Sequence, residues 1–237
     1  MKLNQQDTVG DLIAQHPDWA KSFEGLGIDY CCGGKKTIGQ ACAELGLPLN
    51  AVTDVLETAV GEASSPQRNW SQVPLAELCD HIEQVHHGYL KTELPRLSAL
   101  LQKLVTVHGQ RHPELARLRD TFEELRFELE AHLGKEENIL FPAIRQLEGS
   151  AGEFEFHCGG LGGPISVMEA EHEGAGQALA QMRELTDGYR VPADGCATYR
   201  GTYEAIEKLE ADLHQHIHKE NSILFPRVMA FQPGKDK

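Results

Sequence analysis

Basic residues, aromatic residues and long apolar runs are all scarce in this chain of 237 residues. Lys and Arg number 22 against 36 Asp and Glu, a formal net charge of −14 (22 − 36), and 6% of the residues are aromatic. The shortage of positive charge argues against nucleic acid or an anionic membrane as a partner, because both attract basic surfaces. No stretch approaches the ~18 consecutive apolar residues of a membrane span, and the first residues lack the apolar core of a signal peptide.

Cysteine is too sparse to staple the fold. Six cysteines in a chain of this length do not make a disulfide framework, and two of them, Cys31 and Cys32, are adjacent. Because adjacent cysteines form a strained disulfide, we expect reduced thiols and a cytoplasmic protein. Histidine, by contrast, is abundant, with twelve residues. The positions of these histidines are the main functional signal.

Apolar residues recur at spacings of three and four and nowhere alternate with period two, which predicts an all-α fold. Four long amphipathic segments joined by short loops favour an antiparallel four-helix bundle. A polar stretch rich in Gly, Ser and Pro separates this bundle from a smaller N-terminal part. We therefore predict a small helical domain at 1–60, a linker at 61–72 and the bundle at 73–232. The bundle helices are predicted near 74–106, 113–148, 164–188 and 197–230.

The N-terminal part contains three short helical patterns. Thr8 is expected to cap a first helix that continues through Pro17, and Thr37 a second that Gly46 ends, while Asn50 is expected to cap a third. A unit this small is marginally stable alone. We therefore expect it to dock on the larger part or on a second subunit, which makes a homodimer a reasonable hypothesis.

An internal repeat is the sharpest pattern in the chain. Residues 132–142 match residues 216–226 at an offset of 84, with His, Lys, Glu and Ile-Leu-Phe-Pro at identical places. An offset of 85 lays His87 on His172 in the preceding helices. Each half of the bundle thus has one histidine on its first helix and a His-x-x-x-Glu motif on its second helix.

These repeated residues have the spacing of metal ligands. His and Glu at positions i and i+4 lie on one helical face, about 6 Å apart at Cβ. The midpoints between successive ligand positions all fall in predicted loops, so in antiparallel helices the ligands share one layer, roughly 30 Å from those loops. Four imidazoles and two carboxylates without thiolate suit a pair of first-row ions, iron first and manganese second. The predicted ligands are His87, His132, Glu136, His172, His216 and Glu220.

Several of these residues have a plainer interpretation. A single histidine on an apolar helix face is more often a packed core residue, and His86 competes with His87 as the ligand, although the 85-residue offset favours His87. Glu128 and Asp212, four residues before a ligand histidine, either accept a hydrogen bond from an imidazole or belong to a solvated acidic face. The histidines predicted to lie at the surface are His81, His108, His112, His214 and His218.

With the segment Asp-Tyr-Cys-Cys-Gly-Gly at 29–34 and Gly-Pro-Ile-Ser-Val-Met-Glu-x-Glu-His at 163–172, nearly the whole chain resembles a known family. The bundle is similar to a hemerythrin-like domain, and the chain to the iron–sulfur cluster repair di-iron proteins (repair of iron centres, YtfE/ScdA type). The resemblance implies two non-haem iron ions in a carboxylate- or oxo-bridged centre, held by the four histidines and two glutamates named above. It also implies restoration of iron–sulfur clusters damaged by nitric oxide or oxidants.

One residue and one loop depart from the family pattern. Oxygen-carrying hemerythrins present a further histidine one turn after the third-helix ligand, where this chain has Gly176. Loss of an imidazole there leaves a coordination position open, which favours reaction or iron release over reversible oxygen storage. The loop at 153–163 is longer than expected for the family, and we assign no role to His157 and Cys158 within it.

Two mechanisms remain open. In the first, ferrous iron leaves the bundle for damaged iron–sulfur proteins, and Cys31 and Cys32 supply soft ligands or redox equivalents, although a buried structural pair is the plainer interpretation of these cysteines. In the second, the centre binds nitric oxide and reduces or sequesters it. A sensor of oxygen or nitric oxide is a third possibility, but no output domain is visible in the sequence.

Overall fold

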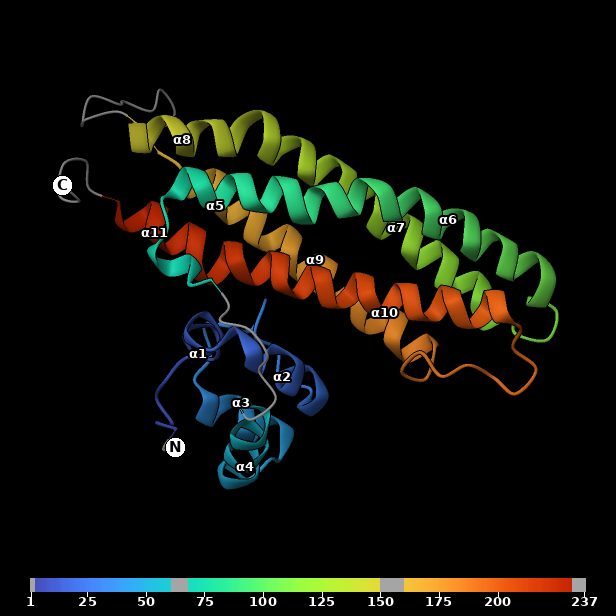
Figure 1. Cartoon of the computed structure of the whole chain (residues 1–237). Coiled ribbons are helices and arrows are strands. Elements are labelled where there is room, and N and C mark those ends of the chain that lie inside the picture. Colours follow the sequence, from blue (N-terminus) through green and yellow to red (C-terminus); the bar gives the residue numbers. More distant parts are fainter. Residues whose placement is uncertain (1–2, 61–67, 150–159, 232–237) are drawn as a thin grey trace. The chain divides into compact units, whose positions relative to one another are not determined.

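The structure is a computed structural model, and it describes residues 3–60, 68–149 and 160–231 (Figure 1). Throughout these ranges the regular elements are helical, which confirms the all-α prediction. None of the described helices is both long enough and apolar enough to cross a membrane. The chain divides into two compact units, one combining Met1–Leu78 with His214–Lys237 and the other formed by Cys79–Leu213.

The N-terminal helices of the first unit surround an apolar core. Trp19 and Phe23 are among its fully buried side chains, together with Ile38 and Leu56. Burying each of these side chains contributes about 1.5–3 kcal/mol. The helices are α1 (Val9–Gln15), the 3-10 turn η1 (Pro17–Trp19), α2 (Ala20–Leu26), α3 (Ile38–Leu45) and α4 (Leu49–Val60).

The predicted helix boundaries in this part are partly right. Thr37 caps α3 in a reciprocal capping box with Gln40, and Gly46 ends α3 in the left-handed conformation (φ 65°), as predicted. Two expectations are wrong. The first helix stops at Gln15 because a proline two residues later lacks the N–H that a continuing helix needs. Asn50 does not cap α4, which already begins at Leu49.

The first unit also contains the C-terminal elements of the chain: the π-helical turn η5 (Lys219–Leu224) and α11 (Phe225–Ala230). Helix α1 packs on η5. A Cβ built on Gly10 would lie 2.5 Å from Oγ of Ser222, and one on Gly34 would lie 2.9 Å from the same atom. Only glycine allows so close an approach of two backbones to this serine. The N-terminal helices therefore pack on η5, the turn that ends with the Ile-Leu of the second Ile-Leu-Phe-Pro sequence.

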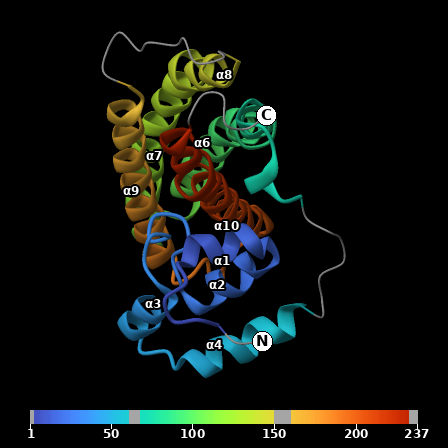
Figure 2. The same ribbon diagram turned by 90° about the vertical axis from the view of Figure 1, so that its left-hand side faces the viewer.

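The second unit consists mainly of long helices (Figures 1 and 2). Helix α7 packs against both α6 and α9, and a short turn at 109–113 joins α6 to α7, where the sequence predicts a loop. Residues 61–67 of the predicted linker (61–72), residues 150–152 and most of the 153–163 loop lie outside the described residues. The elements are η3 (Ile82–His87), α6 (Gly88–His108), α7 (Glu114–Lys135), η4 (Glu136–Leu140), α8 (Phe141–Gly149), α9 (Gly162–Leu185) and the first part of α10 (Ala197–His218); α5 (Leu75–His81) and α10 cross between the units.

Three of the helices wind into a π turn where a predicted ligand lies. His87 ends η3, Glu136 begins η4, and Glu220 lies in η5, whereas His172 lies in the uninterrupted α-helix α9. A π turn holds one extra residue, so it turns the following side chains relative to a continuous α-helix, and such turns are frequent at functional sites. Helical periodicity in the sequence does not predict them.

Candidate metal centre

In the second unit, Glu136 is a buried carboxylate between two histidines. Its side chain is 0% exposed, and Nε2 of His87 and Nε2 of His132 each lie 3.3 Å from its Oε2. Neither carboxylate oxygen of Glu136 has a hydrogen-bond partner among the described residues. Burying a charge in this way is costly unless a compensating charge is close. The pattern at this carboxylate is that of a metal ligand.

His172, on α9, completes the group in this unit. Its Nε2 faces Nε2 of His132 at 3.1 Å, and both rings are buried. His132, Glu136 and His172 offer ligand atoms within 4.8 Å of one another. Two imidazole nitrogens and a carboxylate oxygen directed at one point are a favourable set for a first-row cation. The structure thus brings together four of the predicted ligands, from η3, α7, η4 and α9.

Two carboxylates that the sequence analysis missed hold these histidines. Glu137 Oε1 accepts a hydrogen bond from Nδ1 of His87 at 2.8 Å, and Glu171 Oε2 accepts one from Nδ1 of His132 at 2.8 Å. Because each carboxylate can only accept, each Nδ1 carries a proton, which leaves Nε2 as the ring nitrogen that a metal ion would bind. The sequence signal was the position of both glutamates, each directly adjacent to a predicted ligand.

A lysine pairs with each of these carboxylates. Lys91 Nζ lies 2.7 and 2.8 Å from the two oxygens of Glu137, and Lys135 pairs with Glu171. Partial burial alone would raise the pKa of both glutamates. Hydrogen bonds from the lysine and the histidine outweigh it and hold the pKa of each below its usual value. Both groups are therefore carboxylates at neutral pH.

Glu128 and Asp212, the two acidic residues considered as hydrogen-bond acceptors for the ligand histidines, do not hold them in the structure. Glu128 is exposed on α7. Asp212 Oδ1 lies 2.9 Å from Nδ1 of His86, so it pairs with the neighbour of the predicted ligand. His86 and His87 are both buried, but it is His87 whose ring nitrogen faces Glu136. This geometry favours His87 as the ligand, in line with the 85-residue offset.

The second repeat places its own pair in the first unit. Nε2 of His216 lies 3.0 Å from Oε1 of Glu220, and both side chains are buried. As in the first repeat, the spacing of four residues puts imidazole and carboxylate on one face of the helix. His218, predicted at the surface, is instead buried with its ring centroid 5.6 Å from that of Tyr30, and burial lowers its pKa to about 4. His108 is likewise buried rather than exposed.

The adjacent cysteines lie in a tight turn of the first unit. Both are free thiols, 3.6 Å apart at sulfur. The carboxylate of Asp29 accepts hydrogen bonds from the backbone N–H groups of Cys31, Cys32 and Gly33 at 2.8–3.0 Å. Asn221, the residue after Glu220, donates its side-chain amide to the Cys31 carbonyl oxygen at 3.2 Å. Cys31 is buried and Cys32 partly exposed.

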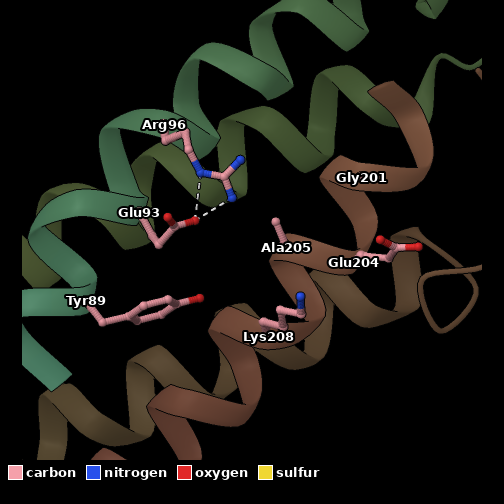
Figure 3. Close-up of a pocket in the computed structure, with 7 residues that line it drawn as sticks. All are labelled: Tyr89, Glu93, Arg96, Gly201, Glu204, Ala205 and Lys208. Carbon is pink, nitrogen blue, oxygen red and sulfur yellow. Dashed lines mark hydrogen bonds and ion pairs between the residues drawn. The ribbon is translucent and has the colours of Figure 1, made fainter. Parts of the chain in front are cut away.

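A surface pocket of about 260 Å³ between α6 and α10 does not compete with this centre (Figure 3). Arg96 lines this pocket, but its Nε donates to Glu93 at 2.8 Å, so the charge of the guanidinium is already neutralised. The other two charged lining residues, Glu204 and Lys208, have opposite charges. The lining residues are Tyr89, Glu93, Arg96, Gly201, Glu204, Ala205 and Lys208.

The donor set in the second unit fits iron. Neutral imidazoles and carboxylates suit iron or manganese, whereas a structural zinc site would be closed by four ligands and often by thiolates. A carboxylate with both oxygens available, as in Glu136, can bridge two ions. The buried cluster of His and Glu side chains thus fits a di-iron centre.

Two family models match the chain. The one described as "Hemerythrin HHE cation binding domain" matches residues 80–228, and the ScdA N-terminal model, described as a domain of unknown function (DUF542), matches residues 5–60. The first model covers the bundle and its six predicted ligands. The second covers the N-terminal helices and the adjacent cysteines.

Several curated proteins are similar along almost their whole length. One from Edwardsiella ictaluri is 38% identical over 224 residues, covering 93% of this chain and 96% of the relative. Relatives from Escherichia coli O81 and Escherichia fergusonii are 37% and 36% identical, each covering 94% of this chain and 96% of the relative. All three are named "Iron-sulfur cluster repair protein YtfE".

Proposed function

Since this chain belongs to the hemerythrin-like family of iron–sulfur cluster repair proteins, we propose that it repairs iron–sulfur clusters damaged by nitrosative or oxidative stress, by donating iron. The observation that carries this proposal is the buried carboxylate of Glu136 between two imidazoles. When bound, the two iron ions supply Lewis acidity and reversible one-electron chemistry. In the donation reaction ferrous iron is also the cargo.

The proposed ligand set combines both repeats. His87, His132, Glu136 and His172 already converge in the second unit, and His216 with Glu220 repeats the His-x-x-x-Glu pair. Equal distances of these positions from their connecting loops support one common layer. We propose that these four imidazoles and two carboxylates would hold the two iron ions, and that the carboxylates would offset part of the charge of the ions.

The cysteine pair is proposed to assist the transfer. Cys31 and Cys32 offer two soft sulfur ligands in a turn with one partly exposed thiol. A hydrogen bond to Cys32 and burial raise the pKa of the Cys31 thiol well above its ordinary value, so Cys31 keeps its proton in the absence of a cation. A ferrous ion that binds there would displace that proton, as thiolate binding requires.

A second candidate function is binding and reduction or sequestration of nitric oxide at the same centre. The observation that favours it is Gly176, which is one turn after His172 and brings no imidazole to the site. A sensor that reports oxygen or nitric oxide to a partner is a weaker alternative. We nevertheless propose a repair protein that donates iron rather than a classical enzyme, because the relatives that match the chain are named as repair proteins.

We propose damaged iron–sulfur proteins as the macromolecular partners and nitric oxide or oxygen as small ligands, with no nucleic-acid or membrane partner. The acidic composition and five free thiols among the described cysteines support a cytoplasmic location. A homodimer remains a proposal that rests on the small size of the N-terminal domain.

Anaerobic purification, iron quantification and Mössbauer spectroscopy test the centre. We expect two iron ions per chain in a coupled pair. Mixing this protein with a cluster-free ferredoxin and sulfide should restore the visible absorption of the ferredoxin cluster. Catalytic conversion of nitric oxide to nitrous oxide without iron transfer would favour the second candidate, and one zinc ion with no iron would overturn both.

The double variant Cys31→Ala/Cys32→Ala tests the thiols separately. It should keep two iron ions per chain and transfer them at least several-fold more slowly. The single variant Cys42→Ala, a buried cysteine in α3, is the matched control and should transfer at the wild-type rate. Unchanged transfer by the double variant would show that the thiols have no role in the reaction.

A further inference from the structure

Two matching chains of three residues lie just outside the predicted ligands of the second unit. In one, Lys91 pairs with Glu137, which accepts the Nδ1 proton of His87. In the other, Lys135 pairs with Glu171, which accepts the Nδ1 proton of His132. Both are built across helices, since Lys91 is on α6 and Glu137 on η4, while Lys135 is on α7 and Glu171 on α9. Each chain ties a ligand histidine to a neighbouring helix.

The two held histidines belong to different ligand groups. His132 shares a group with His172 and Glu136, all within 4.8 Å. His87 lies in a second group, which also contains Glu136 but neither His132 nor His172. Nε2 of His87 and Nε2 of His132 both approach Oε2 of Glu136. Glu136 therefore belongs to both groups, and the two imidazoles would hold different metal ions.

A carboxylate on the outer nitrogen of a ligand histidine has two effects. It fixes the tautomer and ring orientation, and it makes the inner nitrogen a stronger donor to the metal. The lysine holds the carboxylate in place, because an ion pair with both oxygens, as Lys91 makes with Glu137, restricts rotation of that group. The carboxylates are only 25% and 33% exposed, so water competes weakly for them.

From this geometry we propose that Glu137 and Glu171 are positioning residues, and that each controls the retention of a different one of the two iron ions. This proposal deepens the proposed function and rests on its di-iron centre. It assigns to the outer carboxylates, rather than to the ligands alone, the control of how readily iron leaves the protein. Loss of either one should loosen a single ion and leave the other held.

Release of ferrous iron to an excess of a coloured ferrous chelator, under anaerobic conditions, tests the proposal. Each of Glu137→Gln and Glu171→Gln keeps the size of the side chain but removes its charge. Each should release one of two equivalents about 10–100-fold faster than wild type, the usual cost of losing such a carboxylate. The double variant should release both equivalents fast.

Glu128→Gln is the matched control, because Glu128 is an exposed glutamate one helical turn before His132. Its release should follow the wild-type time course. The thermal midpoints of all the metal-free variants should stay within a few degrees of wild type, since a positioning role acts only on bound metal.

Three results would overturn the proposal: release unchanged in both single variants, both equivalents accelerated equally by one substitution, or a double variant with only one fast equivalent. A large fall in the thermal midpoint of the metal-free variants would assign the glutamates a structural role instead. Failure of the di-iron centre itself is distinguishable, because the wild-type protein would then hold fewer than two iron ions before any substitution is made.

Discussion

The two repeats of the bundle carry the same ligand types but different neighbours. After Glu136 in the first repeat comes Glu137, which holds His87; after Glu220 in the second comes Asn221, whose amide holds the Cys31 carbonyl. The residue at the same place in each repeat thus holds a proposed metal ligand in the first repeat and the cysteine turn in the second. After duplication the ligand positions kept their identity, while the positions next to them took on separate tasks.

The largest expected effect tests whether the glutamate of each repeat is equally necessary for iron binding. Glu136→Gln and Glu220→Gln should each reduce bound iron from two ions per chain to fewer than one, because either change removes the charge of a proposed ligand. The metal-free Glu136→Gln protein should melt no lower than metal-free wild type, since a buried amide costs less than a buried carboxylate. Elemental analysis and calorimetry check both results. Near-stoichiometric iron in either variant would contradict that role.

The next effect concerns the N-terminal domain, which packs on the second repeat. Phe23 is fully buried in its core, so Phe23→Ala should destabilise that domain by about 3–5 kcal/mol. Hydrogen exchange should rise throughout α1–α4 while α6 and α7 stay protected. Phe127→Ala, which removes a ring 76% exposed on α7, is the control and should change neither. Equal loss of protection in α7 would show that the first repeat also depends on this domain.

A smaller effect is expected at the position where the two repeats differ, Glu137 in the first and Asn221 in the second. Asn221→Asp makes the second repeat resemble the first, but it replaces the donor to the Cys31 carbonyl with an acceptor. The local cost should be about 1–3 kcal/mol, that of an unsatisfied buried group. Amide exchange of residues 31–34 should accelerate accordingly. Asn138→Asp, on the exposed face of η4, should leave that exchange unchanged.

The smallest effect compares thiols near the two ends of α10. Hydrogen bonding from the Tyr199 backbone and from His108 lowers the pKa of the Cys196 thiol to about 7. With a pKa of about 7, Cys196 should be about half thiolate at pH 7. Iodoacetamide should therefore label Cys196 well before Cys31, whose pKa is raised. The Cys196 rate should level off above about pH 8 while the Cys31 rate still climbs, as read by peptide mass spectrometry. Faster labelling of Cys31 at pH 7 would reverse this order.

The sequence predicted most of the helices and four residues that the second unit brings together, for local reasons. Apolar spacing set the long helices, and Thr37 with Gly46 marked the ends of α3. The repeated His-x-x-x-Glu identified Glu136, which proved to be a buried carboxylate facing two imidazoles. Errors occurred where a distant segment decides the environment. His218 was expected in water, but Tyr30, nearly two hundred residues earlier, covers it.

Amino-acid order alone determined the helical class, the duplication and the residue types offered to a metal, because these depend on spacing along the chain. Tertiary structure decided which carboxylate serves which histidine. Glu137 reaches His87 and Glu171 reaches His132 only because separate helices lie side by side, with a π turn shifting the side chains of η4. Hydrogen bonds depend on fractions of an ångström between helices, and that distance is set by the packing of the whole core.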